Sequence, residues 1–249
     1  MGKAERISIS VDRQARIDLA AAFRLAVRMD LHEGVCNHFT LMLPDGKRFL
    51  LNAYGLHWSE VTASNLLALD EKGRVLEGDG EAEKTAFYIH SRIHLANPNA
   101  ACVLHTHMPY ATALTLTEPG RLEMVEQNAL RFADDIAYDD IYNGLVVDDA
   151  EGDRLARVLG TKRVLFLANH GVIVVGPTVS EAYDLLYYLE RACRLQVLAR
   201  ATGLPFRKVR PEVVGETYRM ILADTPKYAG AHFAALKRLL DREEPDYAG

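Results

Sequence analysis

His105 and His107 are the residues of this chain whose types and spacing point most directly to chemistry. They close the apolar run Ala100–Leu104, which is typical of a buried strand. Side chains two residues apart point to the same side of an extended strand. The two imidazoles can therefore approach one point, as the ligands of a first-row metal ion must. A pair of half-buried structural histidines remains the alternative, because the pattern is short.

His170 adds a third candidate ligand at a distant position. It follows the β-type run Arg163–Ala168 in the segment Asn169-His170-Gly171, and another apolar run, Val172–Val175, comes next. Glycine adopts backbone angles that other residues avoid, so the segment suits a tight bend. Three histidines match the ligand count of a catalytic zinc-type site, which keeps a fourth position open for water or substrate. A solvated turn histidine is the alternative when His170 is considered alone.

Strands and helices alternate in the pattern that would have to hold these histidines. Strands are predicted at 39–43, 48–51, 66–69, 101–105, 163–168 and 172–175, with a further short strand within 121–130. Helices are predicted at 13–29, 85–95, 109–116, 147–159, 180–201 and 213–240. Early hairpins followed by strands mixed with helices indicate an α/β fold with a central, mainly antiparallel sheet between helical layers.

Length and composition fit one globular domain, predicted at 1–210, with a helical C-terminal tail at 211–249. The 249 residues are 49% hydrophobic and 25% charged, which is ordinary for a soluble protein. The net charge is −5 and no basic cluster stands out, so nucleic acid and anionic membranes are not expected partners. No apolar run approaches the ~20 residues of a membrane span. The first ten residues lack the apolar core of a secretion signal, which favours the cytoplasm.

The three cysteines do not form a disulfide framework. Cys36, Cys102 and Cys193 are widely spaced and odd in number, as expected in a reducing cytoplasm. Cys102 lies close to the histidine pair but has the opposite strand parity to His105. It is therefore not counted as a metal ligand.

With these pieces in place, the sequence resembles the class II aldolase/adducin family from about Ala15 to Gly203. The segments that carry the resemblance occur in the family's order with similar spacing: Asn37-His38-Phe39-Thr40, Tyr54-Gly55-Leu56, Ser59-Glu60-Val61-Thr62-Ala63-Ser64, His105-Thr106-His107 and Asn169-His170-Gly171. The resemblance implies a three-layer fold and tetramers with sites between subunits. It also implies one divalent metal ion, commonly zinc, on His105, His107 and His170, which stabilises the enolate formed when a carbon–carbon bond breaks.

The sequence departs from the sugar-phosphate aldolases of that family at the helix before the His105 strand. Those enzymes carry a catalytic glutamate there, just after two phosphate-binding serines. The corresponding positions here are Ala86 for the glutamate and Lys84 and Thr85 for the serines. Alanine can neither transfer a proton nor bind a metal, so the resemblance does not supply the acid or base.

A second departure lies in the loop that also binds phosphate in those aldolases. His38 replaces its amide and Thr40 takes the place of its serine. Both departures imply an unphosphorylated substrate and resemble the adducin-like branch. That branch includes bacterial members similar to metal-dependent decarboxylases or aldolases, and animal adducins without an evident enzymatic role.

Candidate residues around the metal follow from these departures. His38 is the candidate for proton transfer or carboxylate binding, because histidine titrates near neutrality, with a structural loop histidine as the alternative. Glu83 is a second catalytic candidate, with a solvated acid near a helix start as the alternative. Lys84, Thr40 and Tyr110 are candidate substrate contacts.

The sequence thus predicts a cytoplasmic, homotetrameric, metal-dependent carbon–carbon lyase. Its substrate is a small, unphosphorylated oxo- or hydroxy-carboxylate, and the reaction is aldol cleavage or decarboxylation. One Zn²⁺ ion per subunit is expected, with Mn²⁺ or Fe²⁺ as alternatives. Two rival functions stay open: a non-catalytic adducin-like interaction protein, and a non-haem iron oxygenase on the same scaffold.

Overall fold

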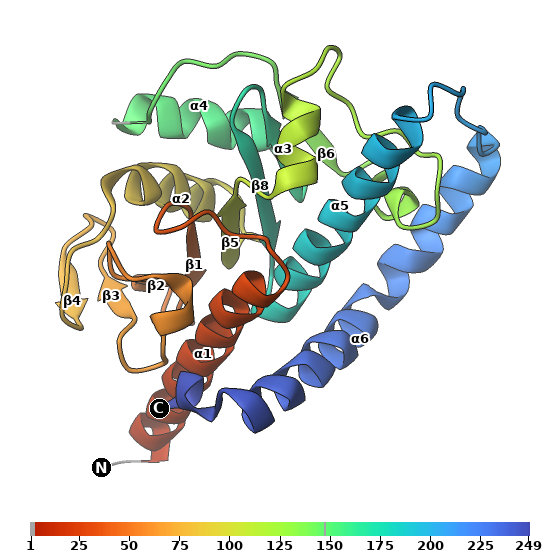
Figure 1. Cartoon of the computed structure of the whole chain (residues 1–249). Coiled ribbons are helices and arrows are strands. Elements are labelled where there is room, and N and C mark those ends of the chain that lie inside the picture. Colours follow the sequence, from red (N-terminus) through yellow and green to blue (C-terminus); the bar gives the residue numbers. More distant parts are fainter. Residues whose placement is uncertain (1–2, 147) are drawn as a thin grey trace.

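One eight-stranded sheet forms the centre of the molecule (Figure 1). The computed structural model describes residues 3–146 and 148–249, with side chains from residue 11 onward. The strands are β1 (His38–Met42), β2 (Phe49–Leu51), β3 (Leu67–Leu69), β4 (Val75–Glu77), β5 (Cys102–Thr106), β6 (Ile136–Asp139), β7 (Val164–Leu167) and β8 (Gly171–Gly176). Their order is β4-β3-β2-β1-β5-β8-β7-β6, and every neighbouring pair is antiparallel except β6 with β7.

Helices cover both faces of this sheet. They are α1 (Lys3–Arg28), α2 (Lys84–Ala96), α3 (Pro109–Thr115), α4 (Asp149–Leu159), α5 (Val179–Arg200) and α6 (Pro211–Glu243). Side chains of α1, α3, α5 and α6 share one core with one face of the sheet, and those of α2 and α4 pack on the other face. The predicted three-layer α/β fold with a mainly antiparallel sheet is confirmed.

The alternation of side chains along β5 divides the two cores. Cys102 and Leu104 face the core under α1 and α5, whereas Val103 faces the core under α2 and α4. Two-residue periodicity places His105 on the same face as Val103. Burial also raises the pKa of the Cys102 thiol, which keeps it in the neutral form. Cys102 therefore faces away from the histidine side of the sheet, in agreement with its exclusion as a ligand.

The C-terminal residues pack against the rest of the chain. Helix α6 is followed by a short 3₁₀ turn, Pro245–Ala248, and the buried side chains of Phe233, Leu240 and Tyr247 join the core under α1 and α5. Buried Arg24 donates to Asp246 across 2.7 Å. The predicted tail thus contributes to the main core.

Several boundaries differ from the predictions. α1 begins ten residues before the predicted start at residue 13, and the predicted helix at 147–159 is α4 from Asp149, with residue 147 outside the described residues. The strand predicted within 121–130 is wrong: residues 121–128 are irregular, and a 3₁₀ helix, Ala129–Phe132, follows. Side chains bind the irregular backbone, since Leu122 N–H donates to the Tyr138 hydroxyl and Glu123 N–H to the Gln196 amide oxygen. Strands β4 and β6, at the two edges of the sheet, were not predicted.

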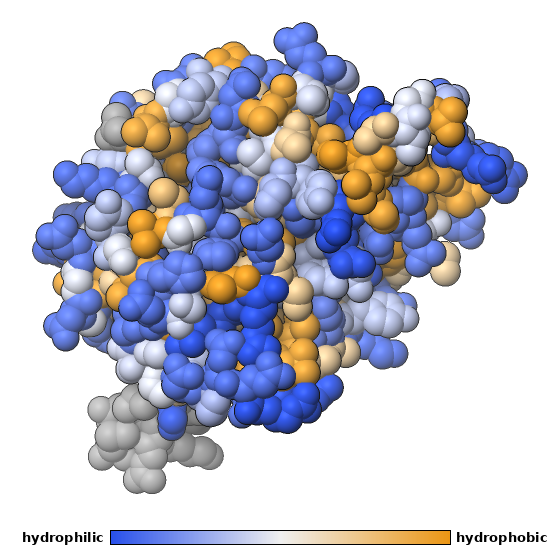
Figure 2. Space-filling view, in the orientation of Figure 1, coloured by the Kyte–Doolittle hydropathy of each residue, from blue (hydrophilic) through white to orange (hydrophobic). Residues whose placement is uncertain are grey.

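The surface is mostly polar on the face shown in Figure 2. Apolar side chains gather there over the end of α5 and the start of α6, where Leu195, Leu198, Leu204 and Met220 are exposed. No helix among the described residues is both long and apolar enough to cross a membrane.

Glu190 on α5 fixes the helix that follows the His107 segment. Its two carboxyl oxygens accept the backbone N–H groups of Tyr110 and Ala111, each across 2.8 Å, at the start of α3. These N–H groups have no partner inside the helix, so a carboxylate satisfies them. Burial nevertheless raises the pKa of Glu190 from its ordinary value of 4.5 to about 7, although the two hydrogen bonds act in the opposite direction.

This shift predicts a pH-dependent stability. A carboxyl whose pKa is raised by folding stabilises the fold below its unfolded pKa, and that contribution disappears as the pH rises through the folded pKa. Between pH 6 and pH 8 the free energy of unfolding should fall by about 1 kcal/mol through Glu190 alone. Urea unfolding at both pH values should show this loss in the unsubstituted protein and not in Glu190→Gln. Glu216→Gln, on the exposed side of α6, is the control, and equal slopes in all three proteins would contradict the assignment.

Candidate metal centre

Three imidazoles converge at one end of the central strands. His105 lies near the end of β5, His107 follows just after it, and His170 lies in the turn between β7 and β8. The ring centroids are 5.0 Å apart for His105 and His107, 4.9 Å for His105 and His170, and 4.7 Å for His107 and His170. One nitrogen from each ring lies within 4.8 Å of the other two. The structure thus brings together the three histidines singled out from the sequence.

The strand pairing explains why residues 63 positions apart in the chain meet. β5 pairs with β8, with Thr106 opposite Val172, so the β7–β8 turn lies beside the end of β5. In that turn Asn169 adopts a positive φ of 56°, and Gly171 opens β8. A Cβ atom on Gly171 would lie 2.5 Å from the Thr106 carbonyl oxygen and 2.8 Å from the His107 ring. The glycine is therefore needed because the turn approaches the Thr106 carbonyl and the His107 ring closely. The positive φ angle expected in this bend is adopted by Asn169 and not by Gly171.

Hydrogen bonds orient two of the three rings. Nδ1 of His105 donates to the Val172 carbonyl across 3.0 Å, which directs its Nε2 toward the other histidines. Nδ1 of His107 bonds to the carboxylate of Glu33. The buried Nε2 of His107 has no hydrogen-bond partner among the described residues. A histidine whose second nitrogen is held by a carboxylate or carbonyl is the usual form of a metal ligand.

The protonation state of the cluster also suits a cation. Burial is the largest cause that lowers the pKa of His105, and it lowers that of His170 to about 4. Both rings are therefore neutral near pH 7 and offer lone pairs. The neutral rings of His105 and His170, together with the buried and unpartnered Nε2 of His107, fit a divalent ion such as Zn²⁺, with coordination positions left for substrate.

Glu33 is the part of this arrangement that sequence analysis missed. It lies in the loop after α1, 74 residues before His107, and its side chain is exposed. No spacing rule links an exposed loop acid to a histidine on a strand. The local sequence offers one indication of a turn at Glu33, the glycine that follows it, and Gly34 adopts a positive φ of 56°.

His38 lies beside the cluster on the neighbouring strand. It opens β1 directly opposite His105, and the two ring centroids are 4.9 Å apart. His38 is buried, and burial lowers its pKa to about 3, although the charge of Glu83 acts in the opposite direction. Its Nδ1 is 2.8 Å from Nε2 of His90 on α2.

Thr40, a candidate substrate contact, lies between two histidines of α2. It is fully buried, and its hydroxyl lies between Nδ1 of His90 at 2.7 Å and Nε2 of His94 at 2.8 Å. Its single hydrogen and one of its lone pairs are therefore engaged by these two histidines. His94 was not singled out from the sequence, although His90 and His94 are four residues apart, which places both on one face of a helix.

Glu83 and Lys84 begin α2. Glu83 is the N-cap, and its carboxylate accepts the backbone N–H of Ala86 across 2.7 Å as well as the Thr85 hydroxyl. Partial burial raises the pKa of Glu83, but these hydrogen bonds outweigh it and hold that pKa below its ordinary value. Lys84 is exposed. Ala86 is fully buried among apolar side chains, so no acid occupies its position.

Tyr110 lies on the opposite side of the sheet from α2. It packs against the core under α1 and α5, and the guanidinium of Arg194 lies 5.4 Å from the centre of its ring. Tyr142 is the aromatic residue closer to the cluster, with its ring 6.3 Å from that of His170 and its side chain exposed.

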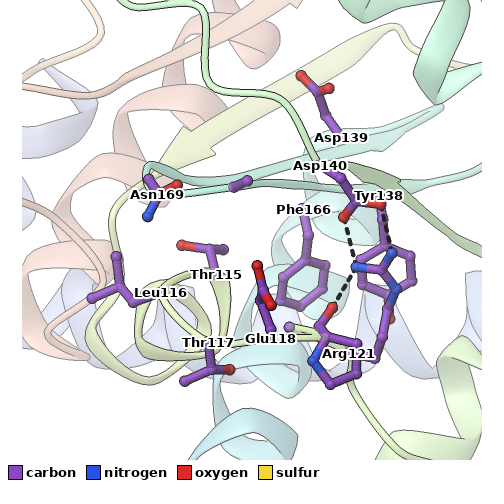
Figure 3. Close-up of a pocket in the computed structure, with 13 residues that line it drawn as sticks. Thr115, Leu116, Thr117, Glu118, Arg121, Tyr138, Asp139, Asp140, Phe166 and Asn169 are labelled. Atoms are coloured by element: carbon purple, nitrogen blue, oxygen red, sulfur yellow. Dashed lines mark hydrogen bonds and ion pairs between the residues drawn. The ribbon is translucent and has the colours of Figure 1, made fainter.

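A separate pocket of about 650 Å³ adjoins the β7–β8 turn (Figure 3). Asn169 lies at one end and Arg121 at the other. Arg121 is committed to Asp140 through two hydrogen bonds of 2.8 and 2.7 Å, and its guanidinium lies 4.1 Å from the centre of the Tyr138 ring. Asp139 is likewise paired with Arg154. Arg121 is the one basic residue among the described residues that line this pocket, and its pairing with Asp140 leaves no free cation there to bind a phosphate. The three histidines do not line the pocket.

Comparison with known proteins adds independent information. Residues 17–197 match the family described as Class II Aldolase and Adducin N-terminal domain. An adducin-related protein of Schizosaccharomyces pombe is 35% identical over 248 residues, covering 93% of this chain and 75% of that protein.

Two solved structures are similar over most of the chain. An aldolase II superfamily protein from Pseudomonas syringae has a TM-score of 0.89 and 33% identity, with 96% of each chain covered. The L-fuculose 1-phosphate aldolase from Glaciozyma antarctica PI12 has a TM-score of 0.82 and 25% identity, covering 94% of this chain and 92% of that one.

Proposed function

Because this chain belongs to the class II aldolase and adducin family, we propose that it is a metal-dependent carbon–carbon lyase. The observation that carries the proposal is the convergence of His105, His107 and His170, with the Nε2 of His107 buried and unpartnered among the described residues. A protein that used this surface only for binding a partner would have no need for an oriented set of imidazoles.

The proposed site holds one divalent ion, with Zn²⁺ as the first candidate and Mn²⁺ or Fe²⁺ as alternatives. When bound, such an ion would stabilise the negative charge that develops on a substrate oxygen as the neighbouring carbon–carbon bond breaks. His105 and His107 are held for this role by the Val172 carbonyl and by Glu33. His38, which lies beside His105 without belonging to the cluster, is assigned the proton transfer.

The proposed substrate is a small hydroxy- or oxo-carboxylate without a phosphate group. Two hydroxyls at the positions of the phosphate-binding serines are already engaged: Thr85 donates to Glu83, and Thr40 lies between His90 and His94. Lys84, exposed at the start of α2, is the cation proposed to attract the substrate carboxylate. Glu83 is assigned to the cap of α2, from which its charge acts on His38. The exposed apolar side chains at the end of α5 and the start of α6 are proposed to contact another subunit of a homotetramer.

The test is a screen of small hydroxy- and oxo-carboxylates with protein loaded with Zn²⁺, Mn²⁺ or Fe²⁺. Release of an aldehyde or of carbon dioxide is expected with at least one compound, and chelation should abolish it. Protein that takes up no stoichiometric metal would favour the rival interaction protein, consistent with the adducin-related relative. Oxygen consumption by the iron-loaded protein would favour the rival oxygenase.

A further inference from the structure

Behind His38 lies a line of buried polar groups that the proposed reaction does not yet use. His38 Nδ1 is 2.8 Å from His90 Nε2, and His90 Nδ1 is 2.7 Å from the Thr40 hydroxyl. The same hydroxyl is 2.8 Å from His94 Nε2, and His94 Nδ1 is 2.5 Å from the Ala100 carbonyl oxygen. All four side chains are buried. The line therefore runs from the metal centre to a backbone carbonyl behind α2.

The carbonyl at the end of the line sets the direction of every hydrogen bond in it. The Ala100 oxygen only accepts, so His94 carries its hydrogen on Nδ1. A neutral His94 then has a lone pair on Nε2, and Thr40 must donate to it. Thr40 has only one hydrogen, so its oxygen accepts from His90 Nδ1–H.

The remaining bond follows in the same way. A neutral His90 accepts at Nε2, so His38 donates to it from Nδ1. Burial lowers the pKa of His94 to about 4 and is the largest cause that lowers the pKa of His90, consistent with neutral rings. With one donor and one acceptor at each step, the neutral line has a single solution, and it leaves a lone pair on Nε2 of His38.

We propose that Thr40, His90 and His94 are positioning residues that hold His38 as the Nδ1–H tautomer, with Nε2 presented to the metal centre as a hydrogen-bond acceptor. Nε2 lies on the ring edge away from α2, and the His38 ring is 4.9 Å from the ring of His105. The inference rests on the proposed function in one respect: it specifies the state of the residue assigned to proton transfer.

An acceptor at this position favours a hydroxylated substrate. In aldol cleavage of a β-hydroxy carbonyl compound, the hydroxyl proton passes to Nε2, and the oxygen's electron pair forms the new aldehyde carbonyl. The carbon–carbon bond breaks, its electrons form the enolate of the other fragment, and the proton on Nε2 returns to the enolate carbon. No further reactant is needed. Decarboxylation alone offers no hydroxyl proton to this acceptor, so aldol cleavage of an oxo-carboxylate with a hydroxyl group β to its ketone is the favoured reaction.

The direct test is made on the unsubstituted protein, and a variant serves only to assign the spectrum. Nitrogen-15 NMR of the histidine rings distinguishes protonated from unprotonated nitrogens. In both the metal-free and the zinc-loaded protein, His38 should show a protonated Nδ1 and an unprotonated Nε2, with the His38→Gln spectrum giving the assignment. A protonated Nε2 on His38 in both forms of the protein would overturn the proposal.

Thr40→Val then tests whether the hydrogen bonds through Thr40 hold His38 as the Nδ1–H tautomer, an effect called here the tautomer lock. The substitution keeps the side-chain shape and removes the hydroxyl. His90 Nδ1–H would face a methyl group, so the Nε2–H tautomer of His38 should become populated. Thr40→Ser keeps the hydroxyl and should restore the original spectrum. With a substrate in hand, kcat of Thr40→Val should fall on the order of tenfold to a hundredfold, with KM and zinc content unchanged. This is at or below the lower end of the roughly 10²–10⁴-fold contribution of general acid–base catalysis, because Thr40 acts through His38.

The proposed lyase function and the proposed tautomer of His38 can be contradicted independently of each other. The expected NMR pattern without lyase activity on any carboxylate would keep the tautomer lock and remove the proposed function. Lyase activity in a protein whose His38 spectrum is the same in Thr40→Val as in the unsubstituted chain would keep the function and remove the lock.

Discussion

Replacement of His107 by alanine is expected to remove bound metal from the protein and with it all turnover. The ring is only partly buried, and its Nε2 has no partner among the described residues, so the fold loses little when it is removed. Zinc binding to a four-ligand structural site is worth about 10–16 kcal/mol, or roughly 3 kcal/mol per ligand, so loss of one ligand should weaken binding by on the order of a hundredfold.

A graded series makes this prediction sharper. Glu33→Gln leaves all three imidazoles but removes the carboxylate bonded to His107, and a change of this kind weakens metal binding by about 10–100-fold. His57→Ala is the matched control, because His57 is also a partly buried histidine but lies outside the cluster. Zinc affinity, from competition with a chelator, and the melting temperature would be measured for each protein. An unchanged zinc affinity in His107→Ala would refute the assignment of that ligand.

The strands that carry the metal centre could be predicted from local sequence. Residues 101–105 and 172–175 are apolar, short and bounded by turn signals, so periodicity alone located β5 and β8 and gave His105 its side of the sheet. That His170 reaches His105 depends on the antiparallel pairing of β5 with β8. Pairing is a long-range property, and only the resemblance to a family supplied it at the sequence level.

Other features of the site depend on contacts that no local pattern records. Glu33 reaches His107 from a loop 74 residues away. β6 was not predicted because it is stabilised by pairing with β7, which follows only after α4. The segment 121–130 does not form the predicted strand because side chains, rather than a neighbouring strand, accept its backbone N–H groups. His94 is a different case: its four-residue spacing from His90 was visible, but its meaning required Thr40 to lie between the two rings.

Gly171→Ala is expected to damage both the fold and the metal centre, although it adds only one methyl group. The new Cβ would lie 2.5 Å from the Thr106 carbonyl oxygen, and backbone inside a paired sheet cannot move aside easily. Overpacking of this kind costs about 1–3 kcal/mol. For a chain of this size, that corresponds to a fall in melting temperature of roughly 2–12 °C.

The effect on the metal follows from the position of the glycine beside His170. The strain is relieved if the β7–β8 turn moves away from β5, and this movement carries the His170 ring away from His105 and His107. Zinc affinity should therefore fall by at least about tenfold, which corresponds to roughly 1.4 kcal/mol. Gly230→Ala is the control, since it lies within α6 with no atom within 4 Å of the added Cβ and should raise stability by about 0.5–1 kcal/mol. A Gly171→Ala protein with unchanged melting temperature and zinc affinity would show that the turn is not held against β5 by close packing, and the convergence of the three histidines would then need another explanation.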